Sequence, residues 1–499
     1  MKGFKLGAYM IGLLCTILAL NFVAALGLAN VTAELGPRLS PGARIILPNS
    51  PDFANAIRRW SPFAAPRFTV VVDVATEQDV AETVEYANEE EIPFLAVSGA
   101  HGTITSLANF HYGIEIWLHR LNWTTISEDS DTVTFGGGIL GGHLVDALWR
   151  SKKYTVTGVC ECIGYLGPLL GGGHGVLQGK YGLASDQIVS LRLVTADGQL
   201  LDVSESEPDP ELFWALQGAG HNFGIVTSVT AKIYDVPDQG VWAREGFYYG
   251  RNSIENAFEA WNQILPRQPP TVTILGVLER NISMVHTDPL LKISVLQENV
   301  SRVDSAYTEA FRALNPIAIT SQVGTYRDIP GWELMAFNST QCAARNISAP
   351  HFAVGLQRWN TTALRMVYEA FSAVTAGNSS FNASEVIFEG YPVQAKMAIP
   401  EDSTAYPFRE DNLYAYPLIR YNANASLDHT AIEVGDALRR IILEGSGREE
   451  LHVYVNFAAG DEAPEQIYGY EEWRLDKLKE LKKKYDPERR LSYFAPIPI

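Results

Sequence analysis

Basic residues and cysteines are both scarce in this sequence. Lysine and arginine number 39 against 57 aspartates and glutamates, which gives a formal net charge of -18. Because such a charge repels nucleic acid and anionic lipid headgroups, the sequence favours a small-molecule substrate over either partner. A hydrophobic content of 46% with 19% charged residues excludes a disordered or fibrous chain. The 499 residues show no internal repeat and predict two or three packed subdomains.

The N-terminus and the glycosylation motifs indicate the secretory pathway. Two lysines precede an apolar run that ends at about Leu28, and Gly27 and Ala29 are small residues spaced as for cleavage. Residues 1–29 are therefore predicted to be a signal peptide, with an uncleaved signal anchor as the alternative. Asn-X-Ser/Thr triplets predict an N-glycosylated, secreted protein with no membrane segment after cleavage. They begin at Asn30, Asn122, Asn281, Asn299, Asn338, Asn346, Asn360, Asn378, Asn382 and Asn424.

The few cysteines raise one question. Cys15 lies within the predicted signal peptide, so Cys160, Cys162 and Cys342 are left in the mature protein. An odd number leaves at least one thiol without a cysteine partner in the chain. In a secreted protein such a thiol is either buried and inert or committed to another covalent partner.

Strand and helix patterns predict an α+β fold. Valine-rich residues 68–75 predict a buried strand, apolar spacing over 77–90 predicts a helix, and 92–97 predicts a second strand. After about residue 237 strands alternate with amphipathic helices, which predicts a second domain. Further strands are predicted at 132–135, 188–195 and 451–457, and further helices at 253–264, 303–314 and 471–485.

Two segments rich in small residues point to a cofactor. Residues 98–103 (Ser-Gly-Ala-His-Gly-Thr) follow a predicted strand, and their backbone amides can converge on an anion. Residues 158–175 are rich in glycine, which occurs where backbone approaches something closely or takes positive φ. The glycine runs 136–142 and 171–175 lack a compact βαβ unit with a ribose-binding acid, so NAD is not the expected cofactor.

The first segment resembles the FAD-linked oxidoreductase family of the PCMH (vanillyl-alcohol oxidase) fold, in particular its berberine bridge enzyme-like branch. His101 matches the family's flavin-linked histidine, which bonds the 8α-methyl carbon while the loop amides hold the pyrophosphate. Val97 stands where relatives carry a basic residue, and Ala100 stands where they carry a glycine.

The second segment resembles the family's Gly-x-Cys run that leads into a triple glycine, and residues 158–175 match it without a gap. The resemblance places Cys160 at the second attachment site, flavin C6, which would explain the odd thiol. Cys162 competes for this role, but only Cys160 is in register. Cys162 is therefore expected to pack as a small buried hydrophobe.

Further segments continue the family pattern in order over nearly the whole mature chain: 181–186, 195–198, 212–220, 222–226, 454–456, 468–469, 473–475 and 484–487. The resemblance implies a PCMH-type FAD-binding domain in two parts at 30–236, an α/β substrate-binding domain with an antiparallel sheet at 237–450, and a C-terminal segment at 451–499 that returns to the FAD domain. It implies FAD bonded to His101 and Cys160, with further contacts from Ser98, Gly99, Ala100, Gly102, Thr103, Gly164, Gly167, Gly171, Gly172, Gly224, Ile225, Val226 and Asn456.

The catalytic base is left open by the sequence. Phe457 stands where many relatives have a tyrosine, and a phenyl ring cannot take a proton. Tyr454 is the catalytic candidate, beside Tyr406, a carboxylate of the second domain, or a substrate that needs no base. His143 and His174 lie in glycine turns and are expected to bond nearby backbone, and no cluster predicts a metal.

The predicted activity is hydride transfer from a small organic substrate to flavin, with oxygen as the acceptor. A natural-product alcohol or amine is favoured over an oligosaccharide, which a pocket lined by acids and tryptophans would favour instead. One alternative is a dehydrogenase that passes electrons to a quinone or protein, because the bulky Ile163 could impede oxygen. Another is a non-catalytic binding glycoprotein, against which His101 and Cys160 together argue. The sequence sets no oligomeric state.

Overall fold

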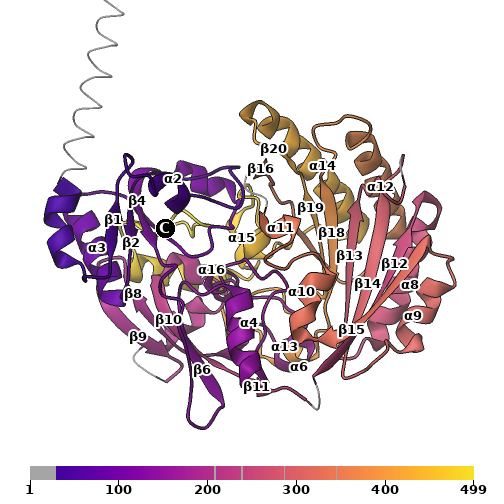
Figure 1. Ribbon diagram of the computed structural model, residues 1–499, viewed down its shortest axis with the longest axis horizontal. Helices are drawn as coiled ribbons and strands as arrows, with labels where there is room; N and C mark the ends of the chain where they lie inside the picture. The colour runs from indigo at the N-terminus through magenta and orange to yellow at the C-terminus, as the bar shows by residue number, and fades with distance from the viewer. Residues whose placement is uncertain (1–29, 207–208, 238–239, 286, 344–345) are drawn as a thin grey trace, which may run out of the picture.

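The computed structural model describes residues 30–206, 209–237, 240–285, 287–343 and 346–499 (Figure 1). The predicted signal peptide lies outside these ranges. Within them, no helix combines the length and the apolar character that crossing a bilayer requires.

The first half of the chain begins with a four-stranded sheet of order β1-β2-β4-β3 (Figure 1). Strand β4 (His111–Trp117) lies between β2 (Arg67–Asp73) and β3 (Phe94–Val97) and is parallel to both. Helix α3 (Glu77–Glu89) joins β2 to β3, while β1 (Arg44–Ile46) is antiparallel to β2. The predicted strand-helix-strand unit is confirmed, with β4 inserted between its two strands.

Helix α3 starts where the sequence supplies a cap. The Thr76 hydroxyl accepts the backbone N–H of Asp79, and the Asp79 carboxylate accepts the N–H of Thr76. This capping box satisfies two donors that the helix leaves free. Val80 and Val84 of the helix are buried in a core with Val70 and Val72 of β2.

A second sheet of five antiparallel strands follows, in the order β5-β6-β10-β8-β9. The predicted strands at 132–135 and 188–195 are confirmed as β6 (Thr132–Gly136) and β8 (Ile188–Val194). Strand β10 (Ile225–Lys232) pairs with both. The outer strands are β5 (Thr124–Ile126) and β9 (Leu200–Ser204).

The second half is built on one seven-stranded antiparallel sheet of order β15-β12-β14-β13-β18-β19-β17. Helices cover its outer face, and its inner face turns toward the first half (Figure 1). The strands are β12 (Val241–Tyr249), β13 (Val272–Glu279), β14 (Leu290–Glu298), β15 (Ala318–Thr325), β17 (Val354–Leu356), β18 (Glu385–Gly390) and β19 (Leu413–Leu418). The covering helices are α8 (Ile254–Ile264), α9 (Ser305–Arg312), α12 (Thr361–Val374) and α14 (Asp428–Ser446).

The C-terminal segment returns to the first half, as predicted. Helix α16 (Glu472–Tyr485) places Lys482 where its ammonium donates to the carbonyl of Asn222 at 2.8 Å, and the Asn222 side chain accepts the N–H of Ile497 at 3.0 Å. The predicted strand at 451–457 is wrong, because only the short 3₁₀ helix η9 (Val455–Phe457) forms there. This stretch is apolar because it is packed between the two halves, not because it joins a sheet.

Shorter elements complete the chain. The helices are α2 (Phe53–Ala56), α4 (Gly141–Arg150), α5 (Leu166–Leu170), α6 (Gln178–Tyr181), α7 (Pro210–Leu216), α10 (Ile329–Trp332), α11 (Thr340–Ala343), α13 (Gln394–Ala398) and α15 (Pro464–Tyr468). The strands are β7 (Lys153–Tyr154), β11 (Tyr234–Asp235), β16 (Ile347–Ser348) and β20 (Tyr421–Asn422).

Candidate functional site

A cavity of about 750 Å³ lies between the two halves. Its walls are the loop after β3, the segment 158–170, the start of β10 and the inner face of the seven-stranded sheet. The volume suits a cofactor or other small ligand. Most of the predicted site residues line this one cavity: Ser98, Gly99, Ala100, His101, Gly102, Thr103, Cys160, Gly164, Gly167, Gly224, Ile225, Val226, Tyr454 and Asn456.

Gly171 and Gly172 do not line the cavity. A Cβ on Gly171 would stand 2.5 Å from the Asn456 amide nitrogen, and a Cβ on Gly172, at φ +116°, would stand 2.5 Å from the ring of Tyr406. These two glycines therefore let the C-terminal segment and Tyr406 pack closely on the turn.

Three other glycines shape the wall of the cavity in two different ways. A Cβ on Gly99 would stand 2.3 Å from the backbone nitrogen of Gly164, so the two loops are in backbone-to-backbone contact. At Gly167, which lines the cavity, no atom lies within 4 Å of the Cβ position. The backbone at Gly167 is thus open to a ligand that must come close, as the flavin expected from the sequence would.

The loop after β3 suits an anion. Ser98 Oγ is buried and has no hydrogen-bond partner among the described residues. Ala100 has φ +53°, a conformation that favours glycine, which is the residue that the family resemblance leads us to expect there. Its carbonyl accepts the backbone N–H of Trp60 at 3.0 Å. An unpaired hydroxyl in a loop of small residues is the chemistry that a pyrophosphate requires.

His101 is held by residues that the sequence did not single out. The ring of Trp60 stacks on its imidazole, with centroids 4.2 Å apart and planes inclined by 15°. The Trp60 indole N–H donates to the carbonyl of Gln341 at 2.7 Å, and Arg59 donates to the carbonyl of Gly102 at 2.9 Å. Trp60 lies between β1 and β2, about 40 residues before His101, so no local motif around His101 points to it.

The expectation that Cys162 packs as a hydrophobe is wrong, because Cys162 forms a disulfide with Cys342 of α11. The two segments meet through Glu161, whose N–H donates to the Met335 carbonyl at 3.1 Å and whose carboxylate accepts the N–H of Phe337 at 2.6 Å. The sequence could not show this contact, because the partner comes from the other half of the molecule.

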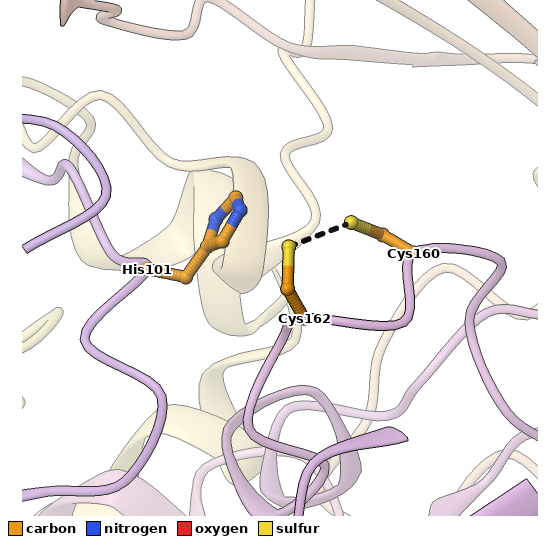
Figure 2. Close-up of side chains that lie close together, drawn as sticks. All are labelled: His101, Cys160 and Cys162. Atoms are coloured by element: carbon orange, nitrogen blue, oxygen red, sulfur yellow. Dashed lines mark hydrogen bonds between the residues drawn. The ribbon is translucent and has the colours of Figure 1, made fainter. Parts of the chain in front are cut away.

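Cys160 is the free cysteine among the described residues. Figure 2 shows the side chains of His101, Cys160 and Cys162 converging on one space, and their nitrogen and sulfur ligand atoms all lie within 4.8 Å of one another. Burial raises the pKa of the Cys160 thiol to about 11. Because Cys162 is disulfide-bonded, this trio offers no second thiolate to a metal, and the absence of a metal stays a prediction.

His174 and Tyr454 belong to a buried aromatic cluster. The expectation that His174 bonds backbone is wrong: its Nδ1 pairs with the Gln178 side chain and its Nε2 with the Tyr406 hydroxyl, each at 2.9 Å. Burial lowers its pKa well below the ordinary value, so the ring is neutral. The Tyr454 hydroxyl accepts the N–H of Gly173 at 3.1 Å, and burial raises its pKa.

The inner face of the seven-stranded sheet carries charge at one end. Arg244 of β12 and Lys292 of β14 donate to the Glu333 carboxylate at 2.9 and 2.7 Å. Burial raises the pKa of Glu333, but the two cations outweigh burial and hold it below its ordinary value. The same face also lines the cavity with the apolar side chains of Leu275, Val277, Ile387 and Leu418.

A second carboxylate stands at the other end of this face. Glu389 of β18 is buried and accepts a hydrogen bond from the Tyr416 hydroxyl at 3.0 Å. Burial raises the pKa of Glu389 to about 7, against the opposing effect of Tyr416 and Tyr391. The ring of Phe457 lies 4.3 Å from that of Tyr416. Sequence reasoning predicted a carboxylate of the second domain without identifying Glu389. The pattern that indicates it is the presence of Glu385 and Glu389 in an otherwise apolar strand.

Comparison with known proteins places the chain among flavoproteins. Residues 68–204 match the family model of the FAD binding domain, and residues 453–498 match that named berberine and berberine like. The chain is 42% identical over 468 residues to FAD-linked oxidoreductase chyH of Penicillium rubens, covering 93% of each protein.

Two solved structures share the fold. BBE-like 1 of Physcomitrella patens superposes with a TM-score of 0.79 at 18% identity, over 93% of this chain and 98% of that one. Xylooligosaccharide oxidase from Myceliophthora thermophila, in complex with xylobiose, superposes with a TM-score of 0.78 at 20% identity, over 94% and 98%.

Proposed function

Because this chain belongs to the FAD-linked oxidoreductases of the berberine bridge enzyme-like family, we propose that it oxidises a natural-product alcohol or amine and passes the electrons to oxygen. The observation that carries the proposal is the single cavity that joins His101 and Cys160 to the inner face of the seven-stranded sheet. Family membership favours an enzyme over the non-catalytic glycoprotein.

FAD is proposed to be bonded to both His101 and Cys160. Trp60 fixes the plane of the imidazole, and Cys160 is the thiol that the disulfide leaves free. Ser98 offers an unpaired hydroxyl to the cofactor, the backbone at Gly167 is open to its approach, and Gly99 lets the two loops that would hold it meet. When bound, FAD supplies the hydride acceptor of the reaction.

Glu389 is the proposed base. Phe457 cannot take a proton, and Tyr454 stays protonated at neutral pH because burial raises its pKa. Burial raises the pKa of Glu389 to about 7, near neutral pH, where a carboxylate can accept the proton of a substrate hydroxyl or amine. Tyr416 orients this carboxylate through its hydrogen bond.

The apolar side chains of the sheet face support a substrate with an aromatic or aliphatic body. Leu275, Val277, Ile387 and Leu418 offer no hydrogen bonds to sugar hydroxyls. A carbohydrate is the second candidate, because Glu279, Glu333, Glu385 and Glu389 also line the cavity, with Trp60 and Trp332. Trp60 is not free as a stacking platform, since His101 covers one face of its ring.

The test is reduction of the bound flavin without oxygen. Candidate phenolic alcohols, amines and oligosaccharides are mixed with the protein, and the flavin absorbance is followed before and after air is admitted. Bleaching by an aromatic alcohol or amine, with peroxide formed on admitting air, is expected. Bleaching of the flavin by oligosaccharides alone contradicts the proposed substrate class. Slow reoxidation without peroxide supports the dehydrogenase alternative, which is favoured by the bulky Ile163 in the cavity wall.

Secretion and N-glycosylation are also proposed. Nine of the ten sequon asparagines are exposed, and Asn281 is half-buried. Asn360 and Asn424 use only their side-chain oxygen to cap a helix, which leaves the amide nitrogen for a glycan. A mature N-terminus at residue 30 and a fall in mass on glycosidase treatment are expected. An N-terminus at residue 1 on membrane-bound protein would support the signal anchor.

A further inference from the structure

Figure 2 shows the sulfur atoms of Cys160 and Cys162 beside His101, and the Cys162 sulfur is bonded to that of Cys342. Sγ of Cys160 lies 3.6 Å from Sγ of Cys162 and 3.9 Å from Sγ of Cys342, which are the two atoms of the disulfide. Cys160 and Cys162 share one loop, whereas Cys342 comes from the other half of the molecule. A thiolate next to a disulfide can attack one of its sulfurs, and here rotation of the Cys160 side chain is needed to bring its Sγ into line with the Cys162–Cys342 bond.

We propose that Cys160, when it is not bonded to flavin, exchanges with the Cys162–Cys342 disulfide, so that Cys342 and the flavin compete for one sulfur. The Cys160 thiolate attacks Sγ of Cys342. A Cys160–Cys342 bond forms, the Cys162–Cys342 bond breaks, and Cys162 leaves as a thiolate that takes up the proton Cys160 lost. No net oxidation occurs. The competition, though not the exchange, rests on the proposed role of Cys160 as a flavin attachment site.

The contacts between the two segments favour attack on Cys342 over attack on Cys162. Glu161 ties the cysteine loop to Met335 and Phe337 by two hydrogen bonds, and Trp60 ties the first half to Gln341, the neighbour of Cys342. The exchanged bond still joins the same two segments, so the backbone can stay in place. Attack on Cys162 would instead close a ring around Glu161 alone and leave no disulfide between the two segments.

The exchange is slow at neutral pH, which gives the flavin time to bond first. Burial raises the pKa of Cys160 to about 11, so the thiolate that must attack is scarce. Uncatalysed disulfide rearrangement takes minutes to hours. The Cys162–Cys342 pairing is therefore the arrangement that keeps Cys160 available, and the exchanged pairing leaves His101 as the one attachment point.

The first experiment uses cysteine variants of the full-length protein, which are acid-quenched, alkylated and mapped by peptide mass spectrometry. In Cys162→Ser, Cys160 and Cys342 are expected to be disulfide-bonded in most molecules. Flavin bonded at Cys160 should fall about fivefold or more, while flavin at His101 remains. Two free, alkylated thiols in this variant would overturn the proposal.

The matched control is the double variant Cys162→Ser/Cys342→Ser, in which Cys160 has no sulfur to exchange with. Flavin at Cys160 is expected to return toward the wild-type level, which separates capture of Cys160 from simple loss of a disulfide. If the double variant has as little flavin bonded at Cys160 as the single variant, the proposed competition is overturned. If wild type itself carries no flavin at Cys160 while the single variant forms the Cys160–Cys342 bond, the pairing of these two cysteines stands and the bicovalent assignment fails.

A second measurement does not depend on the folding of a variant. Wild-type protein from cells limited for riboflavin is incubated and mapped over several hours. A Cys160–Cys342 peptide with alkylated Cys162 is expected to accumulate in molecules that lack flavin at Cys160. Cys162–Cys342 as the sole pairing at every time would overturn the proposal.

Discussion

The wall of the cavity that receives the flavin is made of backbone and small residues, whereas the opposite wall is made of long side chains. On the first wall, Gly99 and Gly164 touch so closely that a single carbon atom would collide. On the second wall, Arg244, Lys292 and Glu389 reach in from three different strands. Adding atoms to the first wall should therefore reduce stability or FAD binding. Removing functional groups from the second wall should reduce activity.

Removal of the Glu389 carboxylate should have the largest effect. Glu389→Gln is expected to lower kcat by about 10² to 10⁴, the usual contribution of a general base, with flavin content unchanged. Because the pKa of Glu389 is raised to about 7, its ionised form increases between pH 6 and 8, so wild-type activity should rise over that range. The variant should lose this rise. Steady-state kcat against pH measures both effects.

The control for this variant is Glu385→Gln, which changes a second acid on the same strand and in the same cavity. The Glu385 carboxylate accepts a hydrogen bond from the Gln341 side chain. Glu385→Gln is expected to lower kcat by at most about tenfold and to keep the rise of activity with pH. If Glu389→Gln keeps the wild-type profile, the base lies elsewhere.

An added methyl group should separate packing from binding on the flavin wall. Gly99→Ala is expected to destabilise the protein by about 1–3 kcal/mol, because its Cβ meets the Gly164 backbone. Gly167→Ala meets no atom within 4 Å and should leave stability unchanged to within about 1 kcal/mol, yet reduce bound FAD. Thermal unfolding and the ratio of flavin to protein absorbance measure the two effects. Full flavin content in Gly167→Ala would show that this backbone does not touch the cofactor.

Trp60 should matter less, because it acts through His101. Trp60→Leu removes a stacking contact worth about 0.5–1.5 kcal/mol, so the fraction of protein with flavin bonded at His101 should fall several-fold. Trp60→Phe keeps a ring and loses only the hydrogen bond to Gln341, worth about 1 kcal/mol. Peptide mapping should find more His101-linked flavin in the phenylalanine variant, and equal amounts in both would exclude a positioning role for the ring.

The smallest effect is expected at Ala100. Ala100→Gly relieves the positive φ and should stabilise the protein by up to about 1 kcal/mol without changing flavin attachment. Ala100→Val should destabilise it. A melting temperature lowered by Ala100→Gly would show that the loop gains more from the reduced freedom of alanine than it loses by strain.

The flavin wall was predictable from the sequence because it depends on local patterns. The loop at 98–103 and the glycines of 158–167 lie where backbone contacts require small residues, and all the predicted contacts there line the cavity. Gly171 and Gly172 belong to the same glycine-rich pattern for a different reason, because they pack closely against Asn456 and Tyr406. A glycine pattern does not tell a ligand from a neighbouring side chain.

The sheet wall and the disulfide were not predictable, because their residues are distant in sequence. Cys342 reaches Cys162 only because the two halves pack together. Burial raises the pKa of Glu389 although hydrogen bonds from Tyr416 and Tyr391 lower it, and the depth of this burial depends on the packing of the two halves. The apolar residues of 451–457 predict a strand, but a chain buried between two domains has the same apolar pattern.

The most direct test of the central claim, that His101 and Cys160 together hold FAD, is the visible spectrum of the purified protein after acid denaturation. The account predicts that yellow colour stays with the denatured wild type and with His101→Ala and Cys160→Ala, and leaves the double variant. Flavin that separates from the denatured wild type, or a protein that stays colourless when FAD is supplied during expression, would contradict it.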